Sequence, residues 1–207
     1  MIGLQELEQK LKHRQPSVIG VQSSYAVLVP LVETSQGLQL LYEVRAETLR
    51  RQPGEICFPG GKLEPGEQPL AGALRETEEE LGIAPQTVQI LGPLDYMHQQ
   101  GLFVMHPYLG VISRETYEAM TYNPDEVKET FLIPLTALTG RPPFVYEYET
   151  IPQVGDDFPY ETVGAKEGYS FARGKVEVPI YEYEGRVIWG ITGRITRCCL
   201  QLMGVCP

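Results

Sequence analysis

Four glutamates lie within five positions of the segment 75–82, RETEEELG. At 100° per residue on a helix, Glu76, Glu79 and Glu80 share one face and Glu78 points elsewhere. Crowded carboxylates repel one another, and the dipole opposes them near the C-terminal end of a helix. A solvated helix face is the ordinary explanation of such a run. Oxygen ligands of this kind are also those that Mg²⁺ takes in proteins, so a divalent metal site is the alternative.

The residues around the cluster favour the metal site. Eight residues stand at fixed spacings: Gly61, Glu67, Arg75, Glu76, Glu79, Glu80, Gly82 and Ile83. This pattern resembles the Nudix box, G-x5-E-x7-R-E-U-x-E-E-x-G-U, in which U is a bulky aliphatic residue. Thr77, in a U position, departs from the pattern. The resemblance implies an α/β fold, namely an α/β/α sandwich around a mixed sheet, with the box as a loop–helix–loop.

The resemblance also implies roles for the residues of the box. Glu76, Glu79 and Glu80 are the expected ligands of Mg²⁺ or Mn²⁺, and a backbone carbonyl near Gly60 or Gly61 completes the sphere. Glu67 and Arg75 are expected to lock the loop onto the helix. The family hydrolyses a nucleoside diphosphate linked to another moiety, and its metals stabilise the attacking and leaving oxygens.

The general base is less well defined by the box. Some family members use a glutamate of the box and others a carboxylate from a later loop. The segment NPDEVKETF offers Glu126 and Glu129 for this role, although either could be a solvated loop acid. The predicted catalytic residues are Glu76, Glu79 and Glu129.

The segment 44–61, VRAETLRRQPGEICFPGG, gives an indication of the substrate. It is similar to a second signature, L-L-T-x-R-S-x3-R-x3-G-x-[LV]-x-F-P-G-G, of the coenzyme A pyrophosphatases within the Nudix family. The matching residues are Arg45, Arg50, Gly54, Phe58, Pro59, Gly60 and Gly61. The departures are Tyr42, Glu43, Ala46 and Ile56. Substrate contacts are therefore predicted for Arg45, Arg50, Gly60 and Gly61, since a guanidinium can grip phosphate bidentately, whereas Arg51 is assigned to the solvent surface.

The resemblance predicts metal-dependent hydrolysis of the pyrophosphate bond of coenzyme A or acyl-CoA. The products are 3′,5′-ADP and 4′-phosphopantetheine or its acyl form. A pyrophosphatase for ADP-ribose, another nucleoside diphosphate-sugar or a dinucleotide stays open. A non-catalytic module that binds a nucleotide is a further alternative, although such modules usually lose carboxylates of the box.

Composition limits the partners. The net charge is −10, from 17 basic and 27 acidic residues, which disfavours nucleic acid because binding it needs a basic footprint. No apolar run approaches the ~18 residues of a membrane span, so we expect a cytoplasmic protein with a small-molecule substrate. The four cysteines are irregularly spaced and expected to be free thiols: Cys57, Cys198, Cys199 and Cys206. The oligomeric state is open, a homodimer included.

The elements that must position these residues form a single domain over residues 1–207. A helix at 68–81 follows from Pro69 in its first turn and Gly82 at its C-terminal cap. The N-terminal extension, 1–20, contains a helix at 4–13, and a last helix is predicted over 189–203. Strands are predicted at 25–34, 37–46, 87–94 and 102–113, a strand running into a short helix at 131–138, and hairpins in 142–188. Tyrosines of that region could stack on adenine or line a pantetheine channel, although cross-strand packing is favoured: Tyr146, Tyr148, Tyr160, Tyr181 and Tyr183.

Overall fold

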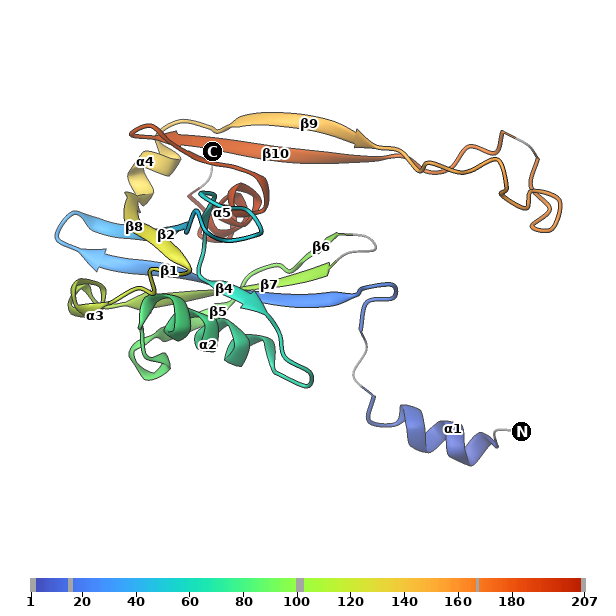
Figure 1. The fold of residues 1–207 in the computed structure, drawn as a ribbon, viewed down its shortest axis with the longest axis horizontal. Helices are drawn as coiled ribbons and strands as arrows, with labels where there is room; N and C mark the ends of the chain where they lie inside the picture. The colour runs from blue at the N-terminus through green and yellow to red at the C-terminus, as the bar shows by residue number, and fades with distance from the viewer. Residues whose placement is uncertain (1–2, 15–16, 100–102, 167, 206–207) are drawn as a thin grey trace.

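The computed structural model describes residues 3–14, 17–99, 103–166 and 168–205, so Cys206 lies outside the described residues. Its larger sheet has the strand order β3-β2-β1-β7-β5, and β4, β6 and β8 pair with β1, β7 and β2 (Figure 1). The bounds of these strands are β1 (Ser23–Thr34), β2 (Gly37–Arg45), β3 (Ile56–Cys57), β4 (Gly60–Lys62), β5 (Gln89–Pro93), β6 (Met97–Gln99), β7 (Phe103–Ile112) and β8 (Val127–Pro134). The predicted strands at 25–34, 37–46, 87–94 and 102–113 are thus confirmed to within a few residues.

The central strand β1 has a different neighbour on each edge. β7 runs parallel to it along its length, whereas β2 and β4 are antiparallel, so the sheet is mixed as predicted. β2 pairs with the C-terminal half of β1, where Leu31 lies opposite Leu40. β4 pairs with the N-terminal half, where Val27 lies opposite Gly60. At that end the order across the sheet is therefore β7, β1, β4.

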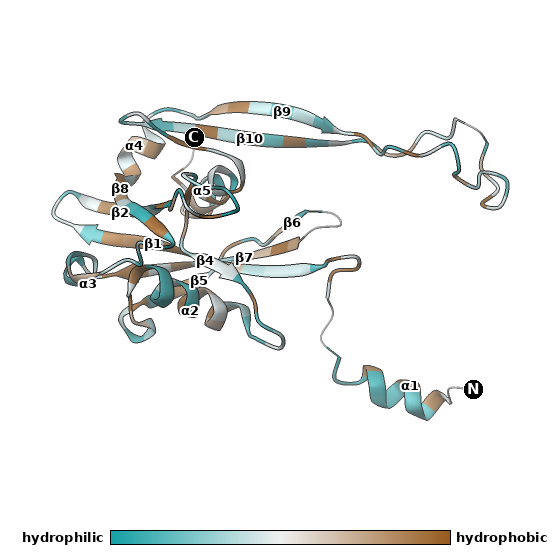
Figure 2. Cartoon of the chain, viewed as in Figure 1, coloured by the Kyte–Doolittle hydropathy of each residue, from teal (hydrophilic) through white to brown (hydrophobic). Residues whose placement is uncertain are grey.

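Helices cover both faces of the sheet. Alternate residues of β1 point to opposite sides, as the period of a strand requires. Val27, Val29 and Leu31 belong to the core that α5 (Gly190–Leu202) closes, whereas Leu28 and Val32 belong to the core beneath α2 (Pro69–Leu81). Figure 2 shows the apolar residues concentrated in β1 and β2 between these helices. The predicted α/β/α sandwich is confirmed.

Helix α2, which carries the glutamates, begins and ends where its sequence predicts. Pro69 stands in its first turn, and Gly82 adopts the left-handed conformation with φ of 65° while its N–H donates to the carbonyl of Glu78. Ala73, Thr77 and Leu81 form its buried face. The Thr77 hydroxyl donates to the Ala73 carbonyl at 2.7 Å, which satisfies the one polar group in an aliphatic position of the box.

A second sheet consists of β9 (Phe144–Thr150), β10 (Gly174–Tyr183) and β11 (Arg186–Ile188), which confirms the hairpins predicted in 142–188. α5 packs against β10, and the segment that joins β9 to β10 projects far beyond the body of the molecule (Figure 1). The remaining elements are α1 (Leu4–Leu11), η1 (Pro85–Thr87), α3 (Arg114–Ala119) and α4 (Leu135–Thr139). No helix within the described ranges is long and apolar enough to cross a membrane.

Candidate active site

A cavity of about 460 Å³ opens beside the glutamate helix. Glu76 and Glu80 of α2 form one side of it, and Gly60 and Gly61 lie next to them. The other lining residues come from β1, β7, α5, the end of β2, the loop from β2 to β3, β3 with the residue after it, and the segment that precedes β8: Tyr25, Val27, Arg45, Leu49, Arg51, Gln52, Glu55, Ile56, Cys57, Phe58, Phe103, Met105, Glu126, Ile191, Thr192 and Ile195. The structure therefore brings the second signature and the box to one place.

The glycine loop and the helix make direct contact. The N–H of Gly60 donates to Oε2 of Glu80 at 2.7 Å. A Cβ on Gly61 would overlap the Glu76 carboxylate. The close approach that the two glycines allow is what lets both carboxylates face the cavity.

Both carboxylates stand in an environment that disfavours negative charge. Glu80 is only 5% exposed, and burial together with the charge of Glu43 raises its pKa to about 9. Burial also raises the pKa of Glu76, although a hydrogen bond from Arg75 acts in the opposite sense. A cation bound between them would remove this penalty, because an opposite charge favours the ionised form.

Arg75 and Glu67 join the loop to the helix, where the sequence placed them. Nε of Arg75 donates to one oxygen of Glu67 at 2.9 Å and Nη2 to the other at 3.1 Å. The same Glu67 carboxylate accepts the N–H of Glu64 at 2.9 Å. The hydrogen bonds from Arg75 and Glu64 lower the pKa of Glu67 and keep it charged. This bidentate pair fixes the segment between β4 and α2.

Glu79, the third predicted ligand, is placed differently. Its side chain is 55% exposed, it accepts a hydrogen bond from Nη1 of Arg75 at 3.1 Å, and it does not line the cavity. Its position on the helix shares the face of Glu76, but Arg75 holds the carboxylate at the outer side.

The two candidate bases of the later loop are separated. Glu126 lines the cavity with Glu76 and Glu80, and its loop is tied to α2 because the N–H of Asn123 donates to the Glu80 carbonyl at 2.8 Å. Glu129 instead forms a two-point ion pair with Arg186, at 3.1 and 3.0 Å, which lowers its pKa. It lines a different hollow. The structure thus brings Glu126, and not Glu129, to the other carboxylates.

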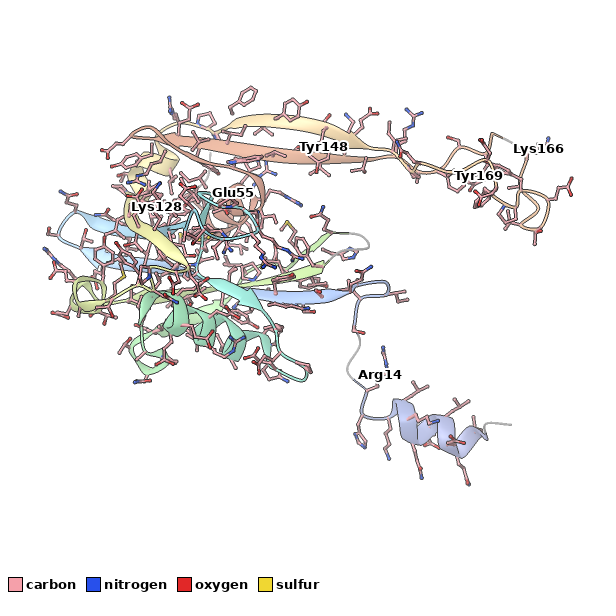
Figure 3. The ribbon with its side chains drawn as sticks, in the orientation of Figure 1. Arg14, Glu55, Lys128, Tyr148, Lys166 and Tyr169 are labelled. Carbon is pink, nitrogen blue, oxygen red and sulfur yellow. The ribbon has the colours of Figure 1, made fainter. Side chains whose placement is uncertain are left out.

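The arginines of the second signature are also divided. Arg45 and Arg51 line the cavity and Arg50 does not, although Arg50 and Arg51 are both exposed. Nε of Arg45 is buried and has no hydrogen-bond partner among the described residues. The spacing of the signature marks Arg50, so the sequence held no signal that Arg51 is the one of the two that lines the cavity; the path of the loop decides it. None of the tyrosines between 146 and 183 lines the cavity, and Tyr148 lies on the ribbon of β9 and β10 (Figure 3).

Glu43 is a buried acid that the sequence marked only as a departure from the signature. It is 1% exposed, and its Oε1 accepts a hydrogen bond from Sγ of Cys57 at 3.2 Å. Its Oε2 has no partner among the described residues. Burial raises its pKa to about 7 and that of the Cys57 thiol well above its ordinary value. A charged residue within the apolar run LLYEV is the signal that could have drawn attention to it.

The donor set fits a divalent cation of the Mg²⁺ or Mn²⁺ type. Glu76, Glu80 and Glu126 offer carboxylate oxygens without any imidazole or unpaired thiolate, which is the preference of these ions. As they stand, no three His, Cys, Asp or Glu side chains of the described ranges converge closely enough to hold an ion. Three carboxylates nevertheless face one cavity, and two of them have raised pKa values, which a nearby cation would lower.

Comparison with known proteins agrees with this geometry. Residues 23–151 match the model of the NUDIX domain, so the chain belongs to the Nudix family. The chain is 39% identical over 138 residues to the peroxisomal coenzyme A diphosphatase NUDT7 of Mus musculus, covering 66% of this chain and 56% of that protein. It is 30% identical over 187 residues to the mitochondrial coenzyme A diphosphatase NUDT8 of Homo sapiens, covering 87% and 70%.

A third relative is Nudix hydrolase 3 of Caenorhabditis elegans, 41% identical over 121 residues, covering 58% of this chain and 50% of that protein. The chain spans about half the length of the mouse and nematode proteins that it matches.

Proposed function

We propose that this protein is a Mg²⁺- or Mn²⁺-dependent pyrophosphohydrolase of coenzyme A or acyl-CoA, which releases 3′,5′-ADP and 4′-phosphopantetheine or its acyl form. One observation carries the proposal. The box carboxylates of Glu76 and Glu80 line the same cavity as Arg45 of the coenzyme A signature, and the neighbouring Arg51 lines it too. The relatives named as coenzyme A diphosphatases support the same substrate.

A divalent cation, when bound, would supply positive charge to the attacking and leaving oxygens of an in-line displacement at phosphorus. Glu76 and Glu80 are the residues proposed to hold it, and Glu79 would join them only by leaving Arg75. Glu126 is proposed to take the proton of the attacking water, in place of Glu129, since Glu126 faces the cavity and Glu129 is engaged by Arg186.

The arginines contribute binding and orientation. Arg45 presents a buried Nε without a partner among the described residues, and Arg51 faces the same cavity, so the two can hold phosphate oxygens of a strongly anionic substrate. Gly60 and Gly61 allow the substrate to approach the backbone beside the carboxylates. The expected partner is thus a small anion, with neither nucleic acid nor membrane, and we expect the cytoplasm as the compartment because the three described cysteines are free thiols.

The test is a comparison of substrates. Coenzyme A, ADP-ribose, NADH and diadenosine polyphosphates are offered at equal concentration with Mg²⁺ and with Mn²⁺, and the products are separated by chromatography. We expect kcat/KM for coenzyme A to exceed the others by about tenfold, or about 1.4 kcal/mol of transition-state binding. If ADP-ribose or a dinucleotide is preferred, the substrate assignment is wrong. If none is cleaved, the protein is better described as a nucleotide-binding module.

A further inference from the structure

We infer that the cavity binds the two halves of its substrate on opposite sides of the glycine loop, with the pantetheine arm against an apolar wall and the 3′-phosphoadenosine half against arginines. The inference rests on the proposed coenzyme A substrate. It adds the direction in which the substrate lies and the residues that select its uncharged half.

The apolar wall consists of side chains from β1, β7 and α5: Tyr25, Val27, Phe103, Met105, Ile191 and Ile195. The strands β1 and β7 are adjacent, with Tyr25 opposite Met105. The rings of Tyr25 and Phe103 meet edge to face, with their centroids 5.6 Å apart. This wall has no charged group, so it is suited to an uncharged, largely aliphatic ligand segment.

The arginine wall consists of Arg45, Arg51, Gln52 and Glu55, at the end of β2 and in the loop that follows it, and Nε2 of Gln52 donates to the Glu55 carboxylate at 2.8 Å. Arg45 and Arg51 are the only cations among the described residues that line the cavity. The backbone N–H of Arg45 donates to the Glu55 carbonyl at 3.0 Å, which fixes the base of this loop. A phosphate group on the substrate finds compensating charge here and at no other described part of the lining.

The order of the strands places the two walls apart. β7 pairs with one edge of β1, and β4, which begins at Gly60, pairs with the other edge. β3 precedes β4 in the chain and pairs with the end of β2, which leads to Arg45, so the segment 56–62 pairs with β2 on one side and with β1 on the other. Gly60, Gly61 and the carboxylates of Glu76 and Glu80 thus stand between the walls. A pyrophosphate held at those carboxylates sends one half of the molecule to each side.

Coenzyme A has two unequal halves about its pyrophosphate. One is the pantetheine arm, which carries amides, a dimethyl group and a thiol but no charge at neutral pH. The other is adenosine with a 3′-phosphate. The reverse orientation would place the adenine ring on Tyr25 and Phe103, and would leave the 3′-phosphate on a wall without a cation. Charge therefore decides the orientation, because an unpaired phosphate beside apolar groups is costly to desolvate.

Product inhibition of coenzyme A hydrolysis tests which wall binds which half of the substrate. The inhibitors are 4′-phosphopantetheine and 3′,5′-ADP, each with Mg²⁺, and the variants are Met105→Ser, Ile191→Ser and Arg51→Ala. We expect the two serine variants to raise the inhibition constant of 4′-phosphopantetheine by about tenfold and to leave that of 3′,5′-ADP within about twofold. Arg51→Ala is expected to raise the inhibition constant of 3′,5′-ADP by about tenfold and to leave that of 4′-phosphopantetheine within about twofold. Leu91→Ser, at an exposed site on β5 outside the cavity, is the control.

Three other outcomes would contradict the inference. If the serine variants weaken 3′,5′-ADP instead, the orientation is the reverse of the one inferred. If both inhibitors keep their constants in every variant, the walls do not contact the substrate halves, and the inference fails while coenzyme A hydrolysis stands. If the wild-type protein does not cleave coenzyme A, the proposed function fails and the inference fails with it. Melting temperatures identify a variant that has unfolded, and Ile191→Ser, in the first turn of α5, carries the test if Met105→Ser is unstable.

Discussion

The carboxylate of Glu76 occupies the space that a Cβ on Gly61 would need. Gly61 belongs to β4 and Glu76 to α2, so this contact joins the loop and the helix of the box at the place where the carboxylate turns into the cavity. The contact explains physically why the box begins with a glycine at this position.

Gly61→Ala is expected to displace the Glu76 carboxylate while the fold is kept, because the atoms in the way belong to a flexible side chain. A displacement of a reacting group by about 1 Å costs on the order of a hundredfold in rate. We therefore expect kcat for coenzyme A to fall by about a hundredfold with an unchanged circular dichroism spectrum. Near-normal turnover would show that the approach of Gly61 is not needed.

Gly60→Ala, in contrast to Gly61→Ala, is expected to lower the stability of the fold. A Cβ there would overlap the Ala26 carbonyl and lie 2.6 Å from Cα of Val27, and the backbone has φ of +149°. Since the obstacle is backbone, the substitution is expected to lower the free energy of unfolding by about 1–3 kcal/mol. Urea denaturation measures this change, and a stability equal to that of Gly61→Ala would contradict it.

Glu76→Gln is expected to lower kcat by about a hundredfold or more, because it removes a charged oxygen donor proposed to hold the cation. Glu78→Gln is the matched control, two positions along the same helix but exposed and outside the cavity. Isothermal titration with Mn²⁺ is expected to show weakened binding in the first variant alone. Equal turnover in both variants would remove Glu76 from the proposed site.

Glu126→Gln and Glu129→Gln test the proposed base. Glu129 is held by Arg186, whose guanidinium also lies 4.0 Å from the centroid of the Phe131 ring, so its loss is expected to change kcat less than about threefold. Glu126→Gln removes an acid that faces the cavity, and we expect kcat to fall by about a hundredfold. The opposite ranking would favour Glu129 as the general base, which is the role that the sequence analysis predicted for it.

The stability of the metal-free protein is expected to fall as the pH rises. Burial raises the pKa of Glu43 to about 7 and that of Glu80 to about 9, above the ordinary value of 4.5. Between 4.5 and those values the folded protein binds more protons than the unfolded chain, so the free energy of unfolding decreases with pH. For Glu43 alone the loss is about 3 kcal/mol.

Urea denaturation in EDTA at pH 5, 7 and 9 measures this slope. Glu80→Gln is expected to flatten it, because an amide does not ionise, and saturating Mg²⁺ is expected to reduce it in the wild-type protein. A stability that rises from pH 5 to pH 9 in EDTA would contradict the raised pKa values.

Local sequence features predicted the elements of the site well. The limits of α2 follow from Pro69 and Gly82, whose conformational preferences act within one turn of the helix. Glu67 and Arg75 form the contact that the resemblance to the Nudix box implied, although Arg75 also donates to Glu76 and Glu79. The strands β1 and β2 follow from a continuous apolar run and the short turn between them.

Contacts between segments that are distant in the chain could not be predicted from local sequence features. The parallel pairing of β1 with β7, which builds the apolar wall, depends on the order of strands and not on either strand alone. Arg50 and Arg51 are neighbours of one type, and only the path of their loop decides which of them faces the cavity. Glu126 and Glu129 likewise differ in their contacts, because Glu129 pairs with Arg186, which lies 57 residues further along the chain.

The projecting segment between β9 and β10 affects how the molecule moves through solvent. A compact chain of 207 residues has a radius of gyration of about 17 Å, whereas this segment extends well past the body (Figure 1). Such a shape has more frictional drag than a sphere of the same 23.2 kDa. A single chain should therefore elute early in gel filtration and resemble a dimer, so light scattering or sedimentation equilibrium, which report mass, must decide how many copies are present.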